Sequence, residues 1–134
     1  LIDSSGNVRY FKYPNNWHHP DTVGYITESD MNENIQQLDS VSLTIENDIL
    51  FKYFSMLKGA SEGHLSHPVN RMFDAGTTIY SGYLFDSIMK EYKHVLIKQW
   101  GDWSIENNSP EAEKIYRWLE STFHYVLENL RSNN

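Results

Sequence analysis

Six histidines give this chain its most direct opportunity for metal chemistry. His64 and His67 are three positions apart, a spacing at which two imidazoles on one helical face can bind the same ion. A zinc site needs three or four ligands, however, and the neighbouring residues have the composition of a polar loop. His18 and His19 precede Asp21, but adjacent side chains rarely converge on one ion. We therefore predict no metal and no cofactor, and we interpret these imidazoles as solvated groups or as caps of nearby carbonyls.

Glutamate and histidine also occur at a spacing known from di-iron helical bundles. Glu91 and His94 fit the Glu-x-x-His pattern, but such bundles need two copies of it and two further glutamates. Glu120 and His124 are four positions apart, so they do not supply the second copy. We interpret the pair at 91 and 94 as a surface contact between helical neighbours.

Signatures of the common enzyme classes are missing from the sequence. It has no Gly-x-Ser-x-Gly nucleophile elbow, no phosphate-binding loop and no dinucleotide fingerprint. It also has no cysteine, which excludes disulfides, thiolate nucleophiles and cysteine-ligated zinc or iron–sulfur clusters. The sequence does not decide whether the protein is an enzyme, and it favours a non-catalytic protein.

Acidic residues are concentrated in one window of the chain. Of 18 acidic residues, seven lie between Tyr13 and Phe51, where there is no lysine or arginine, and this excess equals the net charge of −7. A negative field disfavours nucleic acid and anionic membranes and favours basic partners. No apolar run approaches the roughly 18 residues of a membrane-spanning helix. We therefore expect a protein partner with a basic surface, no nucleic acid, no membrane span and a cytoplasmic location.

The spacing of apolar residues predicts an all-α fold. Thr27 to Asp30 resembles a capping box, and no glycine or proline interrupts the helical pattern that follows it as far as residue 58. Ser109-Pro110-Glu111 is a strong helix start. Residues 8–13 favour a strand, which Pro14 would end. We expect an N-terminal β-hairpin or extended arm over residues 1–26 and a connection over residues 59–73. The three expected helices cover residues 27–58, 74–100 and 109–132.

These elements predict a single domain over residues 1–134, an antiparallel three-helix bundle with a four-helix variant left open. Its function is expected to be protein binding, as a regulator, adaptor or immunity-type inhibitor. Glu28, Asp39 and Glu46 would share one flank of the first helix and attract a basic partner. Trp17 and Trp103 would be aromatic anchors for that partner. A homo-oligomer is also compatible with this interpretation.

A small-molecule sensor is the first alternative. The aromatic content is high, with nine tyrosines, six phenylalanines and four tryptophans. A bundle could enclose an apolar ligand between its second and third helices. The residues that would line such a cavity are Tyr83, Tyr92, Trp118 and Phe123.

One segment is similar to a recurring feature of phage tail and baseplate proteins. In that family a tryptophan-containing loop leads into a short helix with the pattern Ile-Thr-x-x-Asp-hydrophobe-Asn. The matching residues are Trp17, Pro20-Asp21-Thr22, Ile26-Thr27-Glu28-Ser29-Asp30-Met31-Asn32 and Ile35-Gln36-Gln37-Leu38. The family usually has a basic or polar contact after the Asn, where this chain has Glu33, and nothing beyond residue 40 matches. The resemblance implies a structural component of a phage virion, which is the second alternative.

Overall fold

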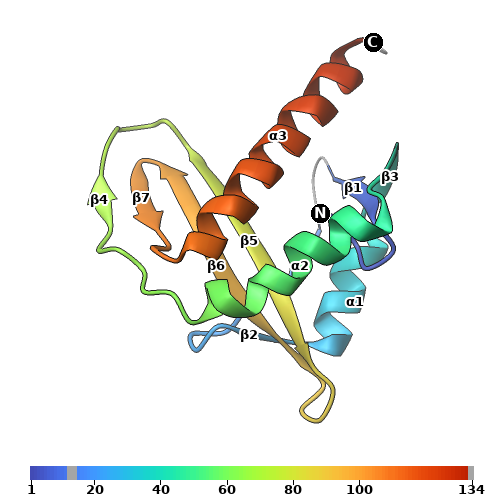
Figure 1. Cartoon of the computed structure of the whole chain (residues 1–134), viewed down its shortest axis with the longest axis horizontal. Coiled ribbons are helices and arrows are strands. Elements are labelled where there is room, and N and C mark those ends of the chain that lie inside the picture. The colour runs from blue at the N-terminus through green and yellow to red at the C-terminus, as the bar shows by residue number, and fades with distance from the viewer. Residues whose placement is uncertain (12–14, 133–134) are drawn as a thin grey trace. The chain divides into compact units, whose positions relative to one another are not determined.

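Figure 1 shows the computed structural model of the protein, which describes residues 1–11 and 15–132. The described part of the chain contains three helices and seven strands in two antiparallel sheets, so the fold is α+β. The predicted all-α helical bundle is therefore wrong. The elements are β1 (Asn7–Tyr10), β2 (Tyr25–Thr27), α1 (Glu28–Gln36), β3 (Asp39–Thr44), α2 (Asn47–Ser61), β4 (Val69–Asn70), β5 (Thr77–Asp86), β6 (Glu91–Gly101), β7 (Trp103–Glu106) and α3 (Pro110–Ser132).

The chain forms two compact units, each built from two stretches of sequence. The first unit comprises residues 1–54 and 83–94, and the second comprises residues 55–82 and 95–134. Consequently α2, β5 and β6 each contribute residues to both units. The larger sheet has the order β2-β6-β7-β4, and β5 pairs with β6 as well.

In the first unit, β1 and β3 form a two-stranded antiparallel sheet in which Tyr10 is paired with Asp39. Gly6 precedes β1 with a φ of 80°, and any β-carbon there would collide with the carbonyl of Ile45. The Ile45 amide donates a hydrogen bond of 2.8 Å to the Gly6 carbonyl. β1 overlaps the predicted N-terminal strand, residues 8–13, at residues 8–10, and the part of that prediction covering residues 12 and 13, with the stop at Pro14, lies outside the described residues.

The predicted first helix, residues 27–58, is replaced by a helix, a strand and a second helix. Its predicted start is confirmed, because Thr27 caps α1 and its hydroxyl accepts a hydrogen bond of 3.1 Å from the Asp30 amide. α1 then ends at Gln36 and β3 follows. Residues 39–44 are rich in serine, valine and threonine, which disfavour helix or favour strand. β3 also pairs with β1, and this pairing with a distant segment cannot be predicted from residues 39–44 alone.

The predicted second helix, residues 74–100, is also wrong, because this segment forms the long hairpin of β5 and β6 (Figure 1). The helical interpretation rested on apolar residues four positions apart, such as Tyr80, Leu84 and Ile88. A spacing of four is a multiple of two, so it also fits one face of a strand. The many β-branched and aromatic residues decide in favour of the strand.

The turn of this hairpin, residues 87–90, is held by Asp86. Its carboxylate accepts hydrogen bonds of 2.8 and 3.1 Å from the amides of Ile88 and Met89. Its carbonyl accepts a third, of 2.9 Å, from the amide of Lys90, whose φ is 56°. The backbone of the turn is therefore well fixed although its side chains include two large apolar groups.

The second unit contains the larger apolar core. α3 lies where the third helix was predicted, and the Ser109 hydroxyl accepts a hydrogen bond of 3.0 Å from the Ala112 amide at its start. Gly82 on β5 lets the Leu57 side chain of α2 approach closely, because a β-carbon there would collide with it. The buried apolar residues of this unit are Leu57, Ala60, Val95, Ile97, Ala112 and Ile115.

No helix in the described residues is long and apolar enough to cross a membrane. This agrees with the sequence, in which no sufficiently long apolar run occurs.

Candidate functional site

Four large apolar side chains are exposed at one end of the second unit, and we call them the aromatic end: Met72, Phe73, Trp100 and Trp103. Phe73 has 88% of its surface exposed, and the two tryptophans have 50% and 49%. Scattered apolar residues are normal on a protein surface, but these four lie on one loop and at the end of the adjoining β6–β7 hairpin, and two of them are tryptophans.

The loop that carries Met72 and Phe73 is fixed to the turn between β6 and β7. The carbonyl of Asp102, in this turn, accepts a hydrogen bond of 2.9 Å from the Arg71 amide. Its carboxylate accepts a hydrogen bond of 2.8 Å from the Ala75 amide. The Asp102 amide donates a hydrogen bond of 3.1 Å to the Gly76 carbonyl. Gly101, with a φ of 136°, is needed here because a β-carbon would collide with that same carbonyl. The exposed apolar groups therefore stand on a rigid backbone.

Strand register places the two tryptophans on different sides of this end. Trp103 is paired with Asn70 of β4, and the Gln99 side chain donates a hydrogen bond of 3.2 Å to the Trp103 carbonyl. Extending the β6–β7 register by one residue sets Trp100 opposite Ser104, on the other face. The apolar surface thus wraps around the end of the β6–β7 hairpin. The Ser104 hydroxyl is buried and has no hydrogen-bond partner among the described residues.

A second cluster lies in the first unit, where His18 is placed between two carboxylates of α1. Its Nε2 is 2.8 Å from Glu33 and its Nδ1 is 3.6 Å from Asp30. Asn34 holds the backbone of His18 in place, accepting from its amide at 2.8 Å and donating to its carbonyl at 2.7 Å. Asn34 itself is only 1% exposed. The prediction for His18 considered only its sequence neighbours and missed Asp30 and Glu33, although their spacing of three on a helix was visible.

This His18 cluster is the one group of metal-ligating side chains that the described residues bring together, with its ligand atoms within 4.8 Å of one another. A single ion would bind one ring nitrogen and both carboxylates. Here each nitrogen points to a different carboxylate instead. The geometry therefore favours a structural role, in which these contacts attach the loop around His18 to α1; we call this set of contacts the His18 latch.

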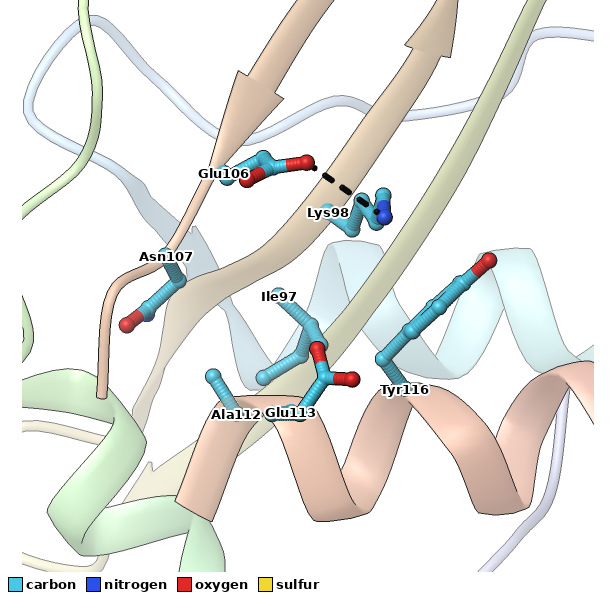
Figure 2. A pocket seen from close by; sticks show the side chains of 7 residues that line it. All are labelled: Ile97, Lys98, Glu106, Asn107, Ala112, Glu113 and Tyr116. Carbon is cyan, nitrogen blue, oxygen red and sulfur yellow. Dashed lines mark ion pairs between the residues drawn. The ribbon is translucent and has the colours of Figure 1, made fainter. Parts of the chain in front are cut away.

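A small pocket lies in the second unit between the β6–β7 strands and α3 (Figure 2). Lys98 crosses it, 3.4 Å from the Glu106 carboxylate and 4.2 Å from the centre of the Tyr116 ring. A hydrogen bond of 2.6 Å from Tyr116 to Glu120, together with burial, raises the pKa of Tyr116 to about 12. The pocket volume of 30 Å³ matches one water molecule. It is too small for a drug-sized or lipid-like ligand.

Asn107, on the wall of this pocket, connects three elements of the second unit. Its side-chain amide donates to the carbonyls of Ala60 at 2.7 Å and Leu96 at 3.0 Å. Its oxygen accepts from the Ser109 amide at 3.1 Å. The end of α2, β6 and the start of α3 therefore meet at one side chain.

The predicted acidic flank is distributed over three elements. Glu28 begins α1, Asp39 begins β3 and Glu46 precedes α2, all in the first unit. The shared helical angle on which that flank was based does not exist, because residues 27–58 are not one helix. Of the two predicted anchors, Trp17 is half-buried, with its ring centre 4.6 Å from that of Phe11, and Trp103 belongs to the aromatic end.

The predicted cavity residues are divided between the units. Tyr83 and Tyr92 lie on β5 and β6 in the first unit, whereas Trp118 and Phe123 lie on α3 in the second. The Tyr83 ring contacts His94, with ring centres 5.2 Å apart. Burial raises the pKa of Tyr83 and lowers that of His94. Glu91 and His94, interpreted as helical neighbours, are instead residues of the strand β6.

Comparisons with known proteins give this chain no relative: no family model, curated protein or solved structure matches it.

Proposed function

We propose that this chain is a non-catalytic protein-interaction domain that binds its partner through the aromatic end. The observation that carries the proposal is the exposure of Phe73, Trp100 and Trp103 on a backbone that Asp102 and Gly101 hold rigid. Tryptophan is enriched among the residues that dominate binding energy, and such residues need a well-packed apolar pocket on the partner.

The energetics of this surface favour binding. Removing a side chain such as Phe73 from water stabilises a complex by roughly 1.5–3 kcal/mol. Because the loop is already fixed by backbone hydrogen bonds, little ordering entropy opposes association. Leaving such groups in water gives the isolated domain no benefit, which supports a role in recognition.

Charge adds a preference about the partner. The first unit has ten acidic and five basic residues, and the second has eight and six. The resulting field would speed the approach of a basic partner more than it would tighten the complex. A partner with a basic rim around an apolar pocket fits both features. The acidic contacts of Glu28, Asp39 and Glu46, the role as regulator, adaptor or inhibitor, and the cytoplasmic location stay predictions.

A phage virion component is the second candidate, supported by one local observation. The segment similar to phage tail proteins does form a loop containing Trp17 followed by a short capped helix, α1. That arrangement is what the resemblance implies. The sensor alternative gains no such support, because the pocket described above, with a volume of 30 Å³, is too small for an apolar ligand of that kind.

The proposal can be tested with a double variant, Phe73→Ser with Trp103→Ala, and a matched control, Val23→Ser, at an exposed site in the first unit. Each protein is used as bait in a lysate of cells that carry the gene, and captured proteins are quantified by mass spectrometry. We expect at least one protein to be captured by the parent and the control and depleted roughly tenfold by the double variant. If every captured protein binds the double variant equally, the aromatic end is not the docking surface. Circular dichroism of all three proteins checks that the fold is intact.

A further inference from the structure

The turn between β5 and β6, residues 87–90, carries two exposed aliphatic side chains in the first unit. Ile88 has 88% of its surface exposed and Met89 has 64%. Turns normally carry glycine, asparagine, aspartate or serine, because these residue types suit the backbone of a turn. The turn lies at the free end of the hairpin, beyond α1 and β2 of the same unit (Figure 1). Its apex is therefore available to an apolar surface outside the unit.

Hydrogen bonds within the protein satisfy the backbone amides of this apex. The amides of Ile88 and Met89 donate to the Asp86 carboxylate, and the Lys90 amide donates to the Asp86 carbonyl. The Lys90 carbonyl accepts a hydrogen bond of 2.9 Å from the Glu28 amide of α1. A backbone that enters a bilayer must find its hydrogen-bond partners within the protein, because hydrocarbon offers none. Three consecutive amides of the apex meet this requirement.

The residue types change in a definite order away from the apex. Behind Ile88 and Met89 lies an aromatic pair, Phe85 and Tyr92, with ring centres 4.8 Å apart. The Lys90 ammonium lies at this level as well, 5.8 Å from the centre of the Phe85 ring. Aliphatic groups in front of aromatic rings and an ammonium match the order of hydrocarbon, interface and headgroups in a membrane. The residues that anchor binding in a protein pocket are more often tryptophan, tyrosine or arginine, and the apex has none of these.

We propose that residues 87–90 form a membrane-binding tip, which inserts Ile88 and Met89 into the outer part of a bilayer of zwitterionic lipid. The carboxylates of Asp86 and Glu91 limit the depth, because charged groups are costly within hydrocarbon. Charge also selects the lipid, since the ten acidic and five basic residues of the first unit disfavour an anionic surface. Two side chains bury less apolar surface than a myristoyl chain, so we expect an association constant below about 10⁴ M⁻¹. The inference does not depend on the proposed function.

Val23, in another turn of the same unit, provides a matched comparison. It is 77% exposed, and the Asp21 carboxylate accepts hydrogen bonds from the amides of Val23 and Tyr25. Its neighbours Thr22 and Gly24 supply no second large apolar side chain. This turn precedes β2, whereas the hairpin turn precedes β6, and the two strands are antiparallel, so the turns lie at opposite ends of the pair. A change at Val23 therefore removes exposed apolar surface without altering the tip.

Co-sedimentation with phosphatidylcholine vesicles at millimolar lipid tests the tip directly. We expect the parent and the control Val23→Ser to bind, and the double variant Ile88→Ser with Met89→Ser to bind roughly tenfold less or weaker. Vesicles that also contain phosphatidylglycerol should bind the parent no better. A parent that does not bind overturns the inference, as does a double variant that binds like the parent or tighter binding to the anionic vesicles. Circular dichroism of each variant checks that the fold is intact.

The absence of cysteine permits a second test, in which a single site carries an environment-sensitive fluorophore. Labelled Met89→Cys should shift its emission to shorter wavelength on phosphatidylcholine vesicles, and labelled Val23→Cys should not. Equal shifts at both sites, or no shift at position 89, overturn the inference. The aromatic-end variant, Phe73→Ser with Trp103→Ala, should still bind the vesicles. Loss of vesicle binding in that variant would assign the binding to the aromatic end and overturn the tip, so this failure is distinguishable from failure of the capture experiment above.

Discussion

The two units of this protein are stabilised by different interactions. In the first unit, three aspartates, Asp3, Asp21 and Asp86, each accept at least two backbone hydrogen bonds, and an asparagine and a histidine connect a loop to α1. Its buried apolar residues are Val8, Ile26, Met31 and Leu38. In the second unit the buried apolar set is larger, and Asn107 is its main polar junction.

Because of this difference, the stability of the two units should respond to different perturbations. Carboxylates that accept backbone hydrogen bonds stabilise a fold only while they are ionised. Apolar packing is insensitive to pH but sensitive to the loss of buried volume. Mutations and pH changes can therefore separate the two units.

The largest expected effect is on the second unit. Ile97 is almost fully buried, so Ile97→Ala leaves a cavity and should lower the free energy of unfolding by about 3 kcal/mol. Urea denaturation followed by tryptophan fluorescence measures this loss. Ile79→Ala, at an exposed position on β5, is the matched control and should cost less than about 0.5 kcal/mol. Equal costs for the two variants would show that the second unit is not held by its core.

A smaller loss is expected from Asn34→Ala in the first unit. This change leaves the amide and carbonyl of His18 without their buried partners and should cost about 2 kcal/mol. Hydrogen exchange at the His18 amide should speed up, while amides of α3 in the second unit keep their protection. Asn32→Ala, two residues earlier on an exposed position of α1, is the control. An unchanged hydrogen-exchange rate at the His18 amide would contradict the proposed role of Asn34 in the His18 latch.

The smallest effect is expected from acid. Burial acts to raise the pKa of Asp3, but hydrogen bonds from Arg9 and Asn7 outweigh it and hold this pKa below its usual 3.8. Because the unfolded chain binds the proton first, the stability that Asp3 contributes is present above pH 3.8 and is lost as pH falls through the lower folded pKa. The hydrogen bond from the Tyr25 amide acts in the same direction on the pKa of Asp21.

Amide NMR spectra recorded from pH 5 to pH 2 should therefore show the β1 resonances losing dispersion before those of α3. Asp3→Asn should reduce the pH dependence, whereas Glu128→Gln, on an exposed position of α3, should not. Simultaneous loss of both sets of resonances would mean that the units do not differ in this respect.

The sequence predicts those parts of the fold whose signals are local. Thr27 and Ser109 mark helix starts correctly, because capping depends on residues three positions away. β3 escapes prediction because its pairing with β1, about thirty residues earlier, decides it, and the hairpin is missed although its two strands are neighbours in the sequence. Apolar residues four apart fit a helix and a strand equally, so the pattern alone could not distinguish the two.

The candidate site was predicted only in part. Trp103 is recognisable from the sequence as an aromatic residue near a Gly-Asp turn, and it belongs to the aromatic end. Phe73 is not, because its loop is fixed by backbone hydrogen bonds to Asp102, about thirty residues later, and such bonds leave no pattern of residue types. The partners predicted for His18 were its sequence neighbours for a similar reason. Its contact with α1 depends on Asn34, sixteen residues later, and the sequence does not indicate that contact.

Asn107 has a consequence for the order of folding. Its amide joins Ala60, 47 residues earlier, to Leu96 and Ser109, so this junction cannot close until α2, β6 and the start of α3 have all met. Contacts between such distant segments form late, since loop closure must precede them. Interactions absent from the transition state act mainly on the unfolding rate. This one side chain is therefore expected to lengthen the lifetime of the folded second unit more than it speeds its formation.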